Sequence, residues 1–191
     1  MINTFPLKEA NKILTLWRTA GPNTYPVDLD LVVEKLVNKT SEGDKLTYSY
    51  DTFDGFEGIF KKRQPKDYVA IINTDINSLG RFNFTKAHEL YHFIGHRKLV
   101  NELMCGNEQL FDYNNDPKET EANNFASQLL IPPDKIRNYI SEQFDYDTIK
   151  AIANELAVSV AAVAYKYLKV SGSKKVAFFQ SRDGFVSKGY A

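Results

Sequence analysis

The sequence lacks several features that would assign it to a protein class at once. Its single cysteine, Cys105, excludes an internal disulfide and any cysteine-rich zinc site. It has no excess charge, because 24 lysines and arginines balance 24 aspartates and glutamates. No overall field therefore attracts nucleic acid, an anionic membrane or an acidic substrate. We expect a protein of a reducing compartment that recognises its partners locally.

Long apolar runs are also missing. No run approaches the roughly 20 residues that cross a bilayer. The amino terminus, MINTFPLKEANKILTLW, lacks the basic start, apolar stretch and small-residue cleavage site of a secretory signal. These absences predict a cytoplasmic protein that does not enter a membrane. The length of 191 residues fits one domain, so we expect residues 1–191 to fold as a single unit.

The pattern of apolar residues predicts an α+β fold. Helical spacing covers about 7–19, 27–37, 84–95 and 117–130. Between residues 46 and 74, the runs LTYSY, FEGIF and YVAIINT are typical of short strands, the last two forming a hairpin.

The C-terminal part has a pattern of its own. Residues 145–170 are typical of two short helices joined at about Val158-Ser159, a pair similar to a helix-turn-helix. The second of these helices is nearly all apolar, and Lys166 is its only basic residue before the end. Packing therefore explains the pair better than phosphate contacts, and direct nucleic-acid binding is not expected. Residues 174–191 predict a terminal hairpin that turns at Arg182-Asp183-Gly184.

The run His88-Glu89-Leu90-Tyr91-His92 is an HExxH motif within a helical segment. At about 100° per residue, the two histidines differ by roughly 40° around the helix, so both imidazoles can reach one metal ion. Zn2+ suits two neutral imidazoles and a carboxylate, with a fourth position left open. Glu89 lies beside that face, where its carboxylate can take a proton from an attacking water. The motif predicts His88 and His92 as zinc ligands and Glu89 as the catalytic base.

A third ligand is expected on the helix that begins near Pro117. Glu119 lies about 50° and Glu121 about 110° from the centre of this helix's apolar face, so Glu119 is favoured and Glu121 is the alternative. Asp116-Pro117-Lys118-Glu119 also fits a helix cap, which gives Glu119 a structural alternative. Asn123, on the same stripe, could orient a ligating histidine through a hydrogen bond.

Two longer patterns resemble the ImmA/IrrE family of zinc metallopeptidases. Arg81-x-x-Phe84-Thr85-x-Ala87-His88-Glu89-Leu90-x-His92, followed by His96, resembles the family's active-site helix. Glu119-x-x-Ala122-Asn123-x-Phe125-Ala126-x-x-Leu129-Leu130-x-Pro132 is similar to its second signature, whose first glutamate is the third ligand. Tyr91 departs from the pattern, because the family usually has glycine there.

The resemblance implies a fold and a function. The fold would be similar to the thermolysin-like zincins, with a small, mostly antiparallel sheet packed on the HExxH helix, further helices and a C-terminal helical pair. The activity would be hydrolysis of a peptide bond in a protein substrate, such as a helix-turn-helix repressor of a mobile element or stress response. A regulatory protein that binds a repressor or toxin without cleaving it is the alternative. His96 lies about 80° from His88 around the helix and after Gly95, so we expect it to be structural.

Overall fold

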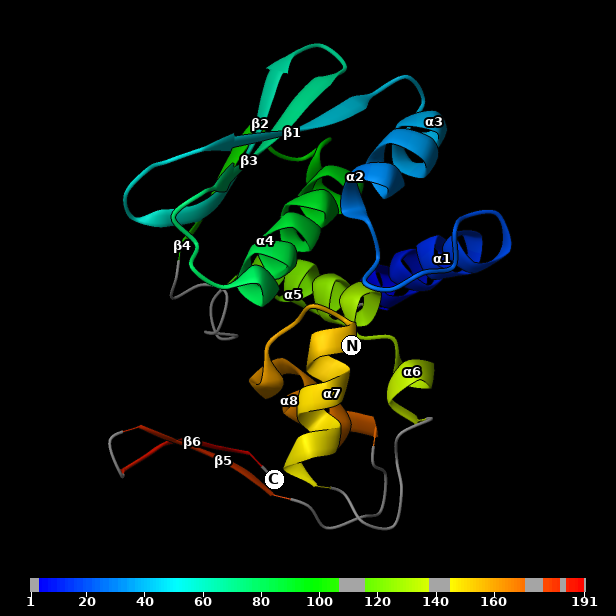
Figure 1. The fold of residues 1–191 in the computed structure, drawn as a ribbon. Coiled ribbons are helices and arrows are strands. Elements are labelled where there is room, and N and C mark those ends of the chain that lie inside the picture. The colour runs from blue at the N-terminus through cyan, green and yellow to red at the C-terminus, as the bar shows by residue number, and fades with distance from the viewer. Residues whose placement is uncertain (1–3, 107–115, 138–144, 171–176, 183–184, 191) are drawn as a thin grey trace.

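A small mixed sheet lies over a stack of helices in the computed structural model (Figure 1). The structure describes residues 4–106, 116–137, 145–170, 177–182 and 185–190. The sheet has four strands in the order β1-β3-β2-β4. Their bounds are β1 (Lys45–Asp51), β2 (Phe56–Gln64), β3 (Asp67–Asn73) and β4 (Glu102–Gly106).

The sheet combines the predicted strands with one that was not predicted. β2 and β3 form the expected antiparallel hairpin, and β4 pairs antiparallel with β2. β1 pairs parallel with β3, so the sheet is mixed rather than antiparallel throughout. The short strand β4 lacks the aromatic and β-branched residues that mark the other three, and its place in the sheet depends on its pairing with β2.

The helices largely follow the predicted segments. The second predicted segment is split in two, α2 and η1, and two short helices, α3 and α6, lie beyond the predicted ones. Their bounds are α1 (Phe5–Thr19), α2 (Leu29–Val32), the π-helix η1 (Val33–Val37), α3 (Asn38–Thr40), α4 (Leu79–Tyr91), the π-helix η2 (His92–His96), α5 (Pro117–Leu130), α6 (Pro133–Arg137), α7 (Tyr146–Glu155) and α8 (Val160–Val170).

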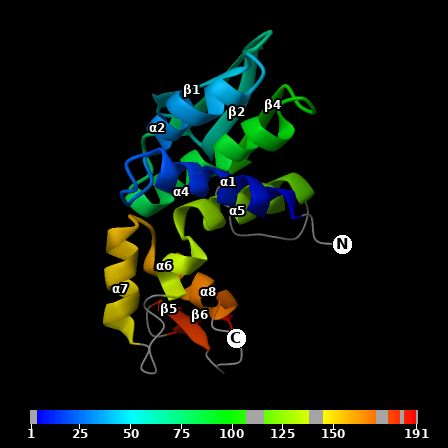
Figure 2. The same cartoon turned by 90° about the vertical axis from the view of Figure 1, so that its right-hand side faces the viewer.

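Helix α4 is the central element, because it lies between the sheet on one side and α5 on the other (Figures 1 and 2). Ala87 and Leu90 on α4 are fully buried in the hydrophobic core. The hydroxyl of Tyr48 on β1 donates a hydrogen bond of 2.8 Å to the carbonyl of Lys86. Arg81, in the first turn of α4, forms an ion pair with the buried Glu57 on β2. These contacts hold one face of α4 against the sheet. The α+β, zincin-like fold class is confirmed.

The C-terminal pair packs beneath α4 and α5 (Figure 1). The two helices meet at a bend of 109°. Asn83 on α4 donates to the carbonyl of Ala157 in the turn between them at 3.1 Å. Lys166 on α8 is buried and donates to Gln128 on α5 at 2.9 Å, so its ammonium is not available to a phosphate.

Two further findings concern this end of the chain. Strands β5 (Phe178–Arg182) and β6 (Phe185–Tyr190) pair antiparallel, as predicted. Two residues of the predicted turn, 183 and 184, lie outside the described residues. Within the described part of the chain, no single helix is long and apolar enough for a membrane span, whereas the bent α7–α8 pair passes that test when its helices are taken together.

Candidate metal centre

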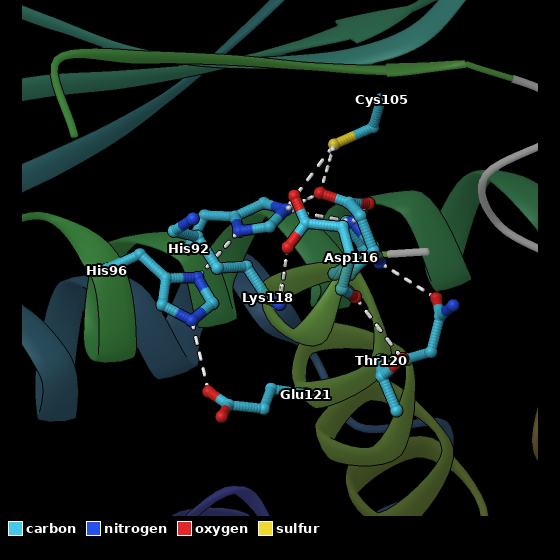
Figure 3. A network of polar contacts seen from close by, with 10 residues as sticks. His92, His96, Cys105, Asp116, Lys118, Thr120 and Glu121 are labelled. Atoms are coloured by element: carbon cyan, nitrogen blue, oxygen red, sulfur yellow. Dashed lines mark hydrogen bonds and ion pairs between the residues drawn. The ribbon is translucent and has the colours of Figure 1, made fainter. Parts of the chain in front are cut away.

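Four potential metal ligands from four elements converge in the core. His88 and His92 come from α4 and the start of η2, Glu119 from the first turn of α5 and Cys105 from β4. One ligand atom from each lies within 4.8 Å of every other. The histidines and the cysteine are fully buried, and Glu119 is 8% exposed. Figure 3 shows Cys105 pointing from the strand toward the carboxylates and imidazoles below it.

The short distances between these atoms would suit a shared cation. The Nε2 atoms of His88 and His92 lie 2.9 Å apart. Glu119 places one oxygen 3.0 Å from His88 Nε2 and the other 3.4 Å from His92 Nε2. Two nitrogen lone pairs and a carboxylate repel one another at such distances unless a cation lies between them.

Hydrogen bonds on the far side of each imidazole set its tautomer. Asn123 Oδ1 lies 3.0 Å from His88 Nδ1, so this nitrogen donates and the Nε2 lone pair faces the cluster. His92 Nδ1 lies 2.9 Å from His96 Nδ1, and His96 Nε2 lies 3.1 Å from a Glu121 oxygen. Because the carboxylate accepts from His96 Nε2, the other His96 nitrogen accepts from His92. His92 therefore also turns an Nε2 lone pair toward the cluster.

The donor set fits zinc. Zinc bonds of about 2.1 Å to nitrogen and oxygen place two ligand atoms of a tetrahedral site roughly 3.3–3.4 Å apart. The separations among the ligand atoms of His88, His92 and Glu119 lie between 2.9 and 3.4 Å. The longest of them matches the tetrahedral value, and the other two are shorter. Two neutral imidazoles and a carboxylate are also a ligand set of zinc peptidases. His88, His92 and Glu119 could therefore hold Zn2+ after small movements of their side chains.

The pKa values of His88 and His92 are shifted in opposite directions. Burial lowers the pKa of His92 well below its ordinary value, and His88 and His96 add to this effect. Burial also opposes charge on His88, but in the metal-free protein the hydrogen bond that protonated His88 donates to Glu119 and the charges of Glu89 and Glu119 raise its pKa overall. His92 is thus held neutral, the form that binds metal.

Glu89 is buried beside this cluster. It is fully buried, and neither carboxylate oxygen has a hydrogen-bond partner among the described residues. Burial raises its pKa to about 7, against an opposing effect of His88. Gly58 on β2 makes room for it, since a Cβ at that position would lie 2.3 Å from Glu89 Oε1. A buried carboxyl group with a pKa near neutrality suits general acid and base chemistry.

The two candidate glutamates have different neighbours in the structure. Glu119 lies in the cluster, whereas Glu121 accepts from His96 and from the Tyr91 hydroxyl, the latter at 3.2 Å. The α5 cap is supplied by Asp116, which accepts from the Lys118 amide at 2.8 Å. Glu119 thus occupies a capping position in the sequence while its carboxylate faces the histidines.

Sequence reasoning did not identify Cys105 or the link through His96 as parts of this site. Cys105 lies on β4, whose position could not be predicted, so the residue had no expected neighbours. His96 lies in η2, whose π-helical turn does not follow the α-helical spacing used to place it. Tyr91 stands where the family usually has glycine, and a Cβ at Gly95 would lie 2.9 Å from its ring. The glycine one turn later thus accommodates the larger side chain.

Comparison with known proteins agrees with this geometry. Residues 35–168 match the peptidase family described as the IrrE N-terminal-like domain. Over 104 residues, the chain is 32% identical to the "Uncharacterized immunity region protein 2" of Bacillus phage phi105. That match covers 54% of this chain and 62% of the phage protein, so it spans less than two thirds of the relative. The family match includes both the HExxH helix and the helix that carries Glu119, and the chain belongs to the ImmA/IrrE family of metallopeptidase-type proteins.

Proposed function

We propose that this chain is a zinc-dependent metalloendopeptidase. We further propose that residues 1–191 form one domain, which includes the helix pair 145–170 and the hairpin 174–191. The observation that carries the proposal is the meeting of His88, His92 and Glu119 next to a buried, unpartnered Glu89. Unpartnered buried carboxylates are costly, and they are retained where chemistry needs them. The family match supports the same activity.

Each residue has a separate role in this proposal. His88, His92 and Glu119 would hold Zn2+, which when bound polarises the scissile carbonyl and makes water more acidic. Asn123 and His96 orient the two imidazoles. Glu89 takes a proton from the attacking water on its carboxylate and delivers it to the leaving amine nitrogen. In the metal-free protein, burial raises the pKa of Glu89 to about 7, so this carboxyl group can hold a proton near neutral pH.

We propose a transcriptional repressor as the substrate, specifically a helix-turn-helix repressor of a phage, another mobile element or a stress response. The similarity to a phage immunity-region protein supports this context. The burial of Lys166 supports recognition of a protein rather than DNA through the C-terminal pair. The balanced charge of the chain agrees with that view.

Co-expression with a repressor encoded beside the gene tests the proposal. The parent protein should shorten the repressor, and mass spectrometry of the fragments should give one cleavage position. Glu89→Gln should keep the metal and lose about 10²–10⁴-fold in cleavage rate, the usual contribution of a general base. Equal cleavage by Glu89→Gln would refute the mechanism. An intact repressor in a stable complex with the parent would instead support the alternative, a regulatory protein that binds without cleaving.

A further inference from the structure

Cys105 occupies the remaining side of the cluster formed by His88, His92 and Glu119. Its sulfur lies 3.4 Å from His92 Nε2 and 3.9 Å from Glu119 Oε1. The side chain is fully buried and points from β4 into the cluster (Figure 3). Bonds of about 2.3 Å to sulfur and 2.1 Å to nitrogen would place the two atoms roughly 3.6 Å apart in a tetrahedral zinc site. The sulfur therefore lies where a fourth ligand belongs.

A second observation points to the same place. In the register of the sheet, Cys105 is opposite Gly58, the glycine that makes room for Glu89. The register of β2 shifts at a bulge between Phe56 and Gly58. Glu89 is fully buried near this pair, and within the described chain its two oxygens lack hydrogen-bond partners. The side of the cluster where Glu89 would need a water is thus taken up by the thiol and the backbone of β2.

We propose that Cys105 binds the metal ion as its fourth ligand and holds the peptidase in a latent state. The inference rests on the proposed function, because it requires the metal that His88, His92 and Glu119 would hold. A zinc site with four protein ligands is closed, whereas a catalytic site keeps one position open. The chain would then carry its own inhibitor of the reaction that Glu89 performs.

The bonding change involves no oxidation or reduction. On ligation, the S–H bond of Cys105 breaks, its proton leaves to solvent, and a sulfur–metal bond forms. On release, the sulfur–metal bond breaks and the sulfur regains a proton. The metal stays divalent throughout. Burial and the nearby carboxylates of Glu89 and Glu119 favour the neutral thiol, as shown by its raised pKa, and a divalent cation reverses this preference.

The position of Cys105 allows such a release. β4 is the last strand of the sheet and pairs only with β2 among the described strands. An edge strand that holds a single neighbour can shift without disturbing β1 and β3. Withdrawal of β4 by a short distance would remove the sulfur while leaving the two histidines and Glu119 on their helices. The latent and open states would thus share the same three ligands.

Cobalt substitution tests the inference directly. Co2+ replaces zinc in such sites, and a thiolate ligand adds a sulfur-to-cobalt charge-transfer band in the near ultraviolet. Because Cys105 is the single cysteine of the chain, such a band can come from no other thiol. The metal-stripped parent, loaded with one equivalent of Co2+, should show the band, and Cys105→Ser should lose it while still binding one Co2+. Cleavage of a demonstrated substrate should rise in Cys105→Ser.

The outcomes separate the two proposals. A parent that binds one Co2+ per chain without the band overturns the role of Cys105 and leaves the peptidase proposal standing. A parent that binds no Co2+ overturns the metal site itself. If Cys105→Ser does not fold, the parent spectrum alone decides. Met104→Ala is the matched control, because this neighbour on β4 is 46% exposed and its variant should keep the band.

Discussion

The region around His88 and the region around α8 both bury charged or polar groups, but these groups differ in whether they have hydrogen-bond partners. In α8, Lys166 donates to Gln128, whose own amide donates to Asn11 at 2.9 Å, so the buried ammonium joins a chain of partners. Near α4, Glu89 is buried with no partner for its oxygens among the described residues, and two imidazole nitrogens face each other at 2.9 Å. The first arrangement is ordinary packing with its polar groups satisfied.

The difference teaches where function is located in this molecule. A buried group without a partner lowers stability, so it persists where a ligand or a reaction requires it. The C-terminal pair contains the helix-turn-helix-like sequence, yet its buried lysine is used in packing. The unsatisfied atoms of Glu89, Glu119 and Asn123 gather where α4, α5 and β4 meet.

The contributions of Glu89 and Lys166 to the free energy of unfolding should depend on pH in opposite directions. The pKa of Glu89 is raised to about 7 from 4.5, so the folded metal-free protein holds a proton that the unfolded chain has lost. Its contribution to stability therefore falls as pH rises from 4.5 to 7, by about 3 kcal/mol in total. Glu89→Gln, stripped of metal, should lack this decline and be more stable than the parent at pH 8. Denaturant unfolding at pH 5 and pH 8 measures it, and an equal decline in both proteins would contradict the account.

Glu121 should matter for metal binding without being a ligand. It accepts from His96, which in turn accepts from His92, so its loss leaves the His92 imidazole free to turn. Glu121→Gln should weaken zinc binding by about 10–100-fold while keeping one zinc per chain. Competition with a chromogenic chelator measures the affinity. Complete loss of zinc would place Glu121 among the ligands, and unchanged affinity would show that the chain through His96 does nothing for the metal.

Lys166 should affect the free energy of unfolding but not the binding of zinc. Burial lowers its pKa from 10.5 to about 8, so the contribution to stability rises as pH increases from 8 to 10.5, opposite in sign to Glu89. Lys166→Met removes a buried charge and should stabilise the protein at pH 7 by about 1 kcal/mol. Zinc affinity should be unchanged. A loss of zinc in this variant would mean that the two regions are coupled, and the comparison between them would fail.

Much of this arrangement could be predicted from local patterns. The HExxH spacing places His88 and His92 on one side of their helix, and the facing of α5 favours Glu119 over Glu121 as the third ligand, before any tertiary information is used. The hairpin of β2 and β3 follows from its strand pattern. These features depend on residues close in sequence, whose geometry is set by the helix or the turn that contains them.

The rest depends on contacts between distant segments. β4 has too short and irregular a pattern to predict, and its pairing with β2 is what carries Cys105 to the histidines. The link from His92 through His96 to Glu121 spans a π-helical turn and a second helix. Glu121 looked like a weaker candidate ligand by its facing alone, and only the packing of α5 on α4 gives it another partner.

Zinc titration of the metal-stripped protein tests the central claim most directly. Isothermal titration should give one zinc per chain for the parent, a loss of that binding for Glu119→Gln, and retained binding for the neighbouring Glu121→Gln. Circular dichroism would show that each variant is folded. A folded parent that binds no zinc, or Glu119→Gln that binds it as tightly as the parent, would contradict the account.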